Sequence, residues 1–236
     1  MPTQAVVFTG GSHIPVWFFA VVVQLELYGL RRPQSSGFVR TSMGLSLLLL
    51  ACACSGSATH AESAGPVFAV LVFTKTVGFR HASIPAGIAA IKSLGHEQDF
   101  RVDTSEDAAV FTEENLVRYR VIVFLNTTGD ILDLNQQAAV ERFIQHGGEF
   151  VGIHAATDTE YDWAWYGRLV GASFANHPPI QMAVVRVVDA THPSTAQLPA
   201  VWTRSDEWYN FRAAPSPHVH VLMEVALQRH FYEHAL

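Results

Sequence analysis

Apolar segments of strand length alternate with amphipathic segments of helix length from residue 67 onward. Val67–Phe73 and Val121–Leu125 are continuous apolar runs, as expected for strands that are buried on both faces. Further elements are predicted from the same periodicity. The predicted strands are Phe100–Asp103, Glu149–His154, Ile180–Val188 and Val219–Met223, and the predicted helices are Ser83–Leu94, Asp133–His146 and Trp163–Leu169.

The helix at Asp133–His146 shows the pattern most clearly. One face carries the apolar residues Ala139, Val140, Phe143 and Ile144, and Gly147-Gly148 ends the helix. Strands that alternate with helices indicate a doubly wound α/β fold, in which helices cover both faces of a mainly parallel sheet. Ligands of such sheets bind beyond the carboxyl ends of the strands. The loops that follow the strands are therefore the place to look for chemistry.

Residues 1–66 differ from the rest and are interpreted as an N-terminal extension. The apolar run Met43–Cys54 follows Arg40 and precedes a stretch of small polar residues, as in a secretory signal. Cys52 or Cys54 would be the lipidated residue of an imperfect bacterial lipoprotein box, and cleavage near Ala61 is the alternative. We expect an exported protein, periplasmic or anchored to the membrane by lipid, whose true start lies later than Met1.

The amino-acid composition argues against several classes of protein function. The chain has 236 residues, with 15 Lys and Arg against 21 Asp and Glu, which gives a net charge of −6. Such a balance argues against a nucleic-acid partner, because nucleic-acid binding needs a basic face. Both cysteines precede the predicted domain, so catalysis by cysteine is excluded there. No glycine-rich dinucleotide or phosphate-binding motif is present, and no such cofactor is expected.

Three of the loops that follow predicted strands are rich in polar groups. They are Thr74–His81, Asn126–Asp130 and His154–Asp158. In the turn Gly152–Ala156, a histidine stands where α/β hydrolases and glutamine amidotransferases place a nucleophile. His154 could therefore be a general base, a metal ligand or a hydrogen-bonding residue of a pocket.

Candidate site residues come from these loops and from two later segments, Asn176–Pro179 and Asp206–Tyr209. A carboxylate beside an aromatic wall, as in the second segment, has the surroundings that favour an acid role. The candidate catalytic residues are His154, His81, Asp206 and Glu207, and the candidate substrate-binding residues are Arg80, Thr127, Thr128, Thr157, Asp158, His177, Trp208 and Tyr209. Three of the histidines and Asp206 could converge on a zinc-like ion, but no metal-binding spacing is present and no metal is assigned.

Four segments resemble the ThuA-like (trehalose utilisation) family: Val77–Ile84, Gly147–Asp158, Trp165–Ala172 and Asp206–Phe211. The resemblance covers residues 67–225 and implies a flavodoxin-like fold of the class I glutamine amidotransferase type without that enzyme's cysteine. It also implies work on carbohydrate. The tail 226–236 has no counterpart in the family, so we expect the C-terminal part of the domain to be incomplete.

The expected function is acid–base chemistry on a disaccharide, glycoside or keto-sugar, by hydrolysis or isomerisation. His154 or His81 would act as the base, and Asp206 or Glu207 as the acid. The partner is a small carbohydrate. Two alternatives stay open, a non-catalytic carbohydrate-binding module and a partner subunit that uses an amidotransferase-like fold without its chemistry.

Overall fold

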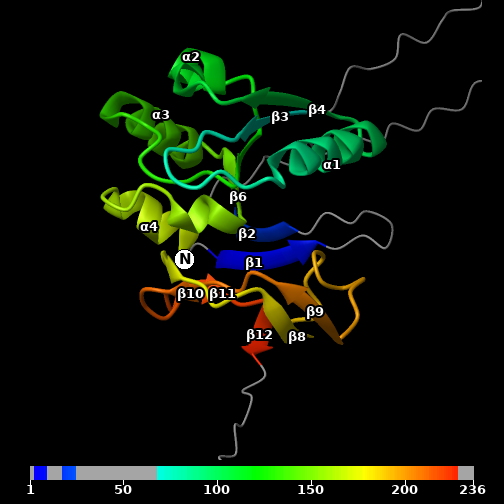
Figure 1. The fold of residues 1–236 in the computed structure, drawn as a ribbon. Coiled ribbons are helices and arrows are strands. Elements are labelled where there is room, and N and C mark those ends of the chain that lie inside the picture. Colours follow the sequence, from blue (N-terminus) through cyan, green and yellow to red (C-terminus); the bar gives the residue numbers. More distant parts are fainter. Residues whose placement is uncertain (1–2, 10–17, 25–67, 228–236) are drawn as a thin grey trace, which may run out of the picture. The chain divides into compact units, whose positions relative to one another are not determined.

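The structure, a computed structural model, describes residues 3–9, 18–24 and 68–227 (Figure 1). The signal-like segment 43–54 and most of the tail 226–236 lie outside these residues. The strands are β1 (Thr3–Thr9), β2 (Phe18–Gln24), β3 (Phe68–Phe73), β4 (Phe100–Ser105), β5 (Val121–Leu125), β6 (Glu149–Ile153), β7 (Phe174–Asn176), β8 (Gln181–Val187), β9 (Val201–Asp206), β10 (Asn210–Phe211), β11 (Val219–His220) and β12 (Met223–Leu227). The helices are α1 (Ile84–Glu97), α2 (Glu113–Leu116), α3 (Leu134–Gln145) and α4 (Ala164–Val170), with 3-10 helices η1 (Ala108–Val110) and η2 (His154–Asp158).

Four parallel strands form one side of the main sheet, in the order β6-β5-β3-β4, with β4 at the edge. The chain leaves β3 to form β4 on one side and then returns to form β5 on the other. The connection therefore reverses direction between β3 and β5, and ligands of doubly wound sheets bind at such a point. The predicted fold class, a flavodoxin-like α/β sheet with flanking helices, is confirmed.

Helices cover both faces of this sheet, because alternate residues of each strand point to opposite sides. Leu71 and Phe73 of β3 pack with residues of α3 and α4, whereas Val70 and Val72 pack against α1. Figure 1 shows α1 on the other side of the sheet from α3 and α4. Burial on both faces explains why these strands are continuous apolar runs in the sequence.

Three strands, β2, β1 and β11, extend the main sheet beyond β6. Strand β2 pairs antiparallel with β6, with Val22 opposite Val151, and β1 pairs with β2 and with β11. Strands β1 and β2 belong to residues 1–66, which the sequence indicated only as an extension. Their pairing gives the edge of β6 a backbone partner, which an open edge strand would lack.

The C-terminal region forms two smaller sheets. The first has the order β12-β8-β9, and the second pairs β10 with β7. The strand predicted at Ile180–Val188 corresponds to β8. The one predicted at Val219–Met223 is wrong in extent, since the chain forms the separate strands β11 and β12 there. Strand β9 was not predicted, because only alternate residues of it are partly buried.

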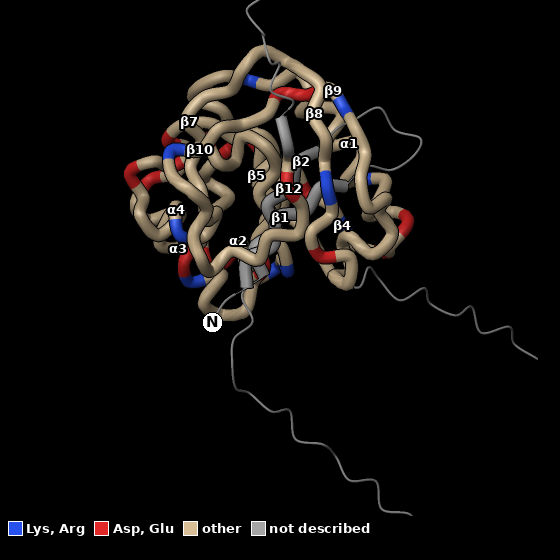
Figure 2. The backbone as a smooth tube through the Cα atoms, turned by 90° about the horizontal axis from the view of Figure 1, so that it is seen from below, with Lys and Arg blue, Asp and Glu red and all other residues tan. Residues whose placement is uncertain are grey.

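Acidic and basic positions are dispersed along the described backbone (Figure 2), so no basic stretch stands out there. None of the helices in the described ranges has the length and hydropathy needed to cross a bilayer.

Candidate functional site

Three histidines and one glutamate from separate loops meet near the carboxyl edge of the main sheet. We call His81, His154, His177 and Glu207 the histidine–glutamate cluster. His154 Nε2 lies 3.1 Å from His81 Nε2 and 3.0 Å from Glu207 Oε2, and His81 Nε2 lies 3.5 Å from the same oxygen. The other carboxylate oxygen, Oε1, is 3.2 Å from His177 Nε2. The structure thus joins positions that are up to 126 residues apart.

The backbone holds His154 in a sharp turn. It follows β6 directly and begins η2, with a φ of 51°, in the left-handed region that non-glycine residues seldom occupy. The turn is tight because Gly152 packs against Ala156, where an added Cβ would lie 3.1 Å from the Ala156 Cβ. Strained backbone of this kind costs about 1–3 kcal/mol and gathers at functional sites. The elbow inferred from Gly152–Ala156 is therefore present, with an imidazole at its tip.

Burial controls the charge of His154. Only 13% of its side chain is exposed. Burial, followed by the nearby His81 ring, lowers the pKa of His154 from 6.5 to about 4, and Glu207 opposes that shift. His154 is therefore a neutral imidazole near pH 7, able to accept a proton or to offer a lone pair.

Aromatic side chains surround the cluster. The Tyr209 ring lies over His154, with ring centroids 4.3 Å apart, and it also contacts Phe174. Burial, and then the charges of Glu207 and Asp158, raise the pKa of Tyr209, so its phenol keeps its proton and can donate a hydrogen bond. Phe79, which is 70% exposed, packs edge-on against His81.

The predicted hydroxyl-binding threonines have other partners. The Thr127 Oγ1 atom is fully buried and lies 2.9 Å from Thr159 Oγ1, which joins the loop after β5 to the end of η2. Thr128 Oγ1 donates to the Phe79 carbonyl and accepts from the Gly78 N–H. These side chains tie together the loops that carry His81 and His154, so they position the cluster instead of facing a ligand.

The side chains of three other predicted site residues bind partners other than the side chains of the cluster. Asp206 forms an ion pair with Arg204, and burial raises the pKa of its carboxyl. Trp208 is 4% exposed and donates its indole N–H to the Gln181 carbonyl within the core of the small sheet. Arg80 forms an ion pair with Glu106 at 2.5 Å.

Thr157 and Asp158 lie on η2, next to the cluster. Thr157 is buried, and its hydroxyl donates to the His154 carbonyl, which supports the elbow. Asp158 accepts a hydrogen bond from the Tyr161 hydroxyl at 2.5 Å. Of the twelve candidates, the structure brings together the four side chains of His81, His154, His177 and Glu207, with Tyr209 against them.

A buried carboxylate, Glu160, was missed by the sequence reasoning. Its Oε1 atom accepts the N–H groups of Ile131 and Leu132, both at 2.7 Å, and its Oε2 atom accepts from the Gln137 side chain at 2.7 Å. Glu160 therefore anchors the loop between β5 and α3. Nothing in its sequence surroundings distinguishes it from an exposed acid.

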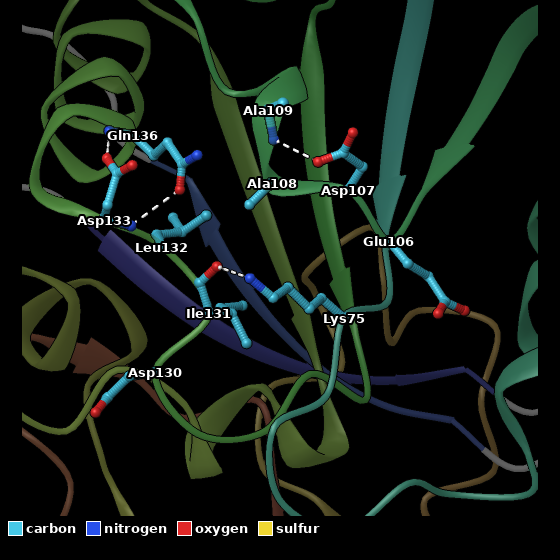
Figure 3. A pocket seen from close by; sticks show the side chains of 10 residues that line it. All are labelled: Lys75, Glu106, Asp107, Ala108, Ala109, Asp130, Ile131, Leu132, Asp133 and Gln136. Atoms are coloured by element: carbon cyan, nitrogen blue, oxygen red, sulfur yellow. Dashed lines mark hydrogen bonds between the residues drawn. The ribbon is translucent and has the colours of Figure 1, made fainter.

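The same loop borders a cavity of about 550 Å³ near the ends of β3, β4 and β5 (Figure 3). Several of its polar groups already have partners in the protein. Lys75 donates to the Ile131 carbonyl, and Asp133 and Gln136 form the capping box of α3. No member of the histidine–glutamate cluster lines this cavity. The cluster is therefore the better candidate for chemistry.

Fold and site together define an α/β domain of flavodoxin-like topology that carries histidines and a carboxylate beyond the carboxyl ends of its parallel strands. The family model for ThuA, described as trehalose utilisation, matches residues 69–233. Since this range is more than half of the chain, the protein belongs to the ThuA family. The resemblance inferred from the sequence is confirmed.

Solved structures agree with this assignment. A ThuA-like protein from Bacteroides uniformis is 27% identical, with a TM-score of 0.60 over 73% of this chain and 72% of its own. A ThuA-like protein from Parabacteroides merdae shares the fold at 18% identity, with a TM-score of 0.53 and 65% of each chain covered. Among curated proteins, none matches the chain.

Proposed function

We propose that this protein processes a carbohydrate, a disaccharide, glycoside or keto-sugar, by acid–base chemistry at the histidine–glutamate cluster. The trehalose-utilisation description of the family supports the substrate class. The observation that carries the chemistry is the 3.0 Å contact between His154 Nε2 and Glu207 Oε2. It joins an imidazole that is neutral near pH 7 to a carboxylate, within the range over which protons are transferred.

In this proposal His154 is the general base. His81, at 3.1 Å, passes protons to and from it, and Glu207, which contacts both imidazoles, receives the abstracted proton from His154 and then serves as the acid partner. Asp206, the other carboxyl considered for the acid, is held by Arg204. The protonated phenol of Tyr209 is suited to donate a hydrogen bond to a sugar oxygen.

The arrangement favours proton abstraction over direct glycoside cleavage. Glycosidases generally use two carboxyl groups about 5–9.5 Å apart on opposite sides of the scissile bond. Here Glu207 is the single carboxylate of the cluster, and it contacts imidazoles. A base of this kind can remove a proton from the carbon next to a sugar carbonyl, leaving the electron pair of the C–H bond in an enolate.

Two outcomes of that enolate fit the family. Return of the proton to the former carbonyl carbon, with transfer of the adjacent hydroxyl's proton to the former carbonyl oxygen, isomerises the keto-sugar. Alternatively, the electron pair expels a glycosidic oxygen, which takes a proton from the acid partner, and later addition of water completes a hydrolysis. In either case the proton leaves carbon and reaches His154 first.

The second candidate is a carbohydrate-binding module without chemistry. Phe79 favours it, because an aromatic side chain that is 70% exposed offers an apolar surface to a sugar ring. This candidate predicts saturable sugar binding with no change in the sugar.

A substrate panel separates these functions. The purified chain is incubated with trehalose, its 3-keto derivative and related glucosides, and the products are followed by NMR. The proposal expects turnover of a keto-sugar, abolished in His154→Ala and kept in His192→Ala, because His192 lies in a separate turn. Binding without turnover by the wild-type chain would support the module, and neither binding nor turnover would overturn the carbohydrate assignment.

A further inference from the structure

The histidine–glutamate cluster has the dimensions of an open metal site. His81 Nε2, His154 Nε2 and Glu207 Oε2 are separated by 3.1, 3.0 and 3.5 Å. Ligand atoms at about 2.0–2.1 Å from a tetrahedral zinc ion lie roughly 3.3 Å apart. The three atoms therefore form a triangle close in size to one face of such a coordination sphere.

The position of the ring protons decides whether the triangle of His81, His154 and Glu207 can accept a cation. A neutral imidazole nitrogen carries either one proton or one lone pair. When both rings carry their proton on Nδ1, the lone pairs of the two Nε2 atoms and of Glu207 Oε2 face one another. The second ring nitrogen of His81, Nδ1, is buried without a hydrogen-bond partner in the described part of the chain. In that tautomer three electron pairs converge on one point, which is the arrangement that a cation requires.

His177 fixes the direction of the carboxylate. Its Nε2 atom lies 3.2 Å from Glu207 Oε1 and donates a hydrogen bond to that oxygen when it carries the ring proton, and its Nδ1 atom lies 2.9 Å from the Pro178 carbonyl. The contact holds the outer carboxylate oxygen and leaves Oε2 facing the two imidazoles. Partners of this kind, one step removed from a metal, typically contribute 10–100-fold to affinity.

We infer that His81, His154 and Glu207 bind a divalent transition-metal ion of the zinc type, with a fourth position open to water or a sugar oxygen. Two histidines and one glutamate with an open position are a ligand set of catalytic zinc. Exposure of 13–22% for these side chains leaves access for a small ion. His177 is a positioning residue that acts through Glu207.

The inference rests on the proposed function for its substrate and deepens it. An ion at this position would polarise a sugar carbonyl or hydroxyl, and its bound water could take the place of His154 as the proton acceptor. The substrate oxygen would then occupy the fourth position. This predicts that a sugar with a carbonyl or adjacent hydroxyls binds the metal-loaded chain more tightly than the metal-free chain.

Titration of the full chain, stripped of metal by a chelator, with Zn²⁺ tests the site. We expect one ion per chain by calorimetry, and Co²⁺ should show the absorption of a four-coordinate ion. Glu207→Gln and His154→Ala should weaken binding more than 100-fold, and His177→Ala 10–100-fold. His192→Ala is the matched control and should bind as the wild type does. Circular dichroism must first show that each variant is folded.

The outcomes separate this inference from the proposed function. Zn²⁺ binding that is weak, or unchanged in folded Glu207→Gln and His154→Ala, overturns the metal site. If the metal-free chain nevertheless turns over a keto-sugar in a His154-dependent manner, the proposed function stands without the ion. Tight binding that these variants abolish, with no sugar bound or converted, supports the metal site and overturns the proposed function.

Discussion

Replacing Glu160 with alanine should destabilise the protein by more than an ordinary surface change. Glu160 is 2% exposed and accepts two backbone N–H groups, those of Ile131 and Leu132, whose residues are themselves buried. Each buried N–H group that is left without an acceptor costs about 1–3 kcal/mol, which gives roughly 2–6 kcal/mol for the two groups. Removal of a buried charge offsets part of this cost. We therefore expect the free energy of unfolding to fall by about 2–4 kcal/mol.

Urea unfolding followed by tryptophan fluorescence measures this change. Glu160→Gln keeps an oxygen acceptor for both N–H groups, so it should cost less than the alanine variant. Asp130→Ala is the control: its exposed carboxylate is next to the same loop, and its loss should change stability by at most about 0.5 kcal/mol. A Glu160→Ala variant as stable as this control would refute the reasoning.

The contribution of Glu160 to the stability of the protein should change with pH in one direction. Burial raises the pKa of Glu160 above 4.5 in the folded state, against the pull of its hydrogen bonds. Its stabilising contribution is therefore fully present below the unfolded-state pKa and declines as the pH rises through the folded-state pKa. Glu160→Gln lacks this decline, so its stability relative to the wild type should improve between pH 4.5 and neutrality. A constant difference over that window would contradict the shift.

Three further predictions concern other parts of the chain. Gly95→Ala should lower stability by about 1–3 kcal/mol despite better helix propensity, because the new Cβ would lie 2.7 Å from the Phe100 carbonyl oxygen; calorimetric melting measures it, and an unchanged melting temperature would contradict it. Thr128→Val removes the two hydrogen bonds that hold the loop before His81, and it should reduce turnover more than it reduces melting temperature; equal turnover would refute the positioning role. The signal-like segment predicts that the mature chain in its native host begins after residue 51 and so lacks β1 and β2; mass spectrometry would show this start, and a soluble chain that begins upstream of Met43 would exclude export.

The strands and helices around the parallel sheet could be predicted because each of their sequence patterns suits a single type of element. Val121–Leu125 is a strand with the predicted bounds, since an apolar run of five residues between polar neighbours suits a strand buried on both faces. The predicted helix at Asp133–His146 differs from α3 by its caps alone, and Asp133 and Gln136 form the capping box. Strand β9 could not be predicted in this way, because its residues are only partly buried on one side.

Within the site, the sequence located the loops but not the direction of each side chain. Asp206 and Glu207 are neighbours, yet Asp206 shares a strand face with Arg204, two residues before it, and pairs with it. Glu207 follows the end of β9 and points to the imidazoles. Which of these two carboxylates faces the imidazoles depends on the residue at which the strand ends. Sequence periodicity locates strand ends only to within a few residues. The threonines after β5 were misread for a related reason, since only the packed loops show what their hydroxyls bind.

The most direct test of the central claim follows a single proton. The wild-type chain is mixed with 3-keto-trehalose in D₂O, and ¹H NMR measures deuterium exchange at the carbon next to the carbonyl. Because general acid–base groups typically contribute about 10²–10⁴-fold to rate, exchange should slow by that factor in His154→Gln and stay unchanged in His192→Ala. Both variants should melt as the wild type does. Equal exchange in His154→Gln, or a loss that parallels a loss of melting temperature, would contradict a role for His154 in moving that proton.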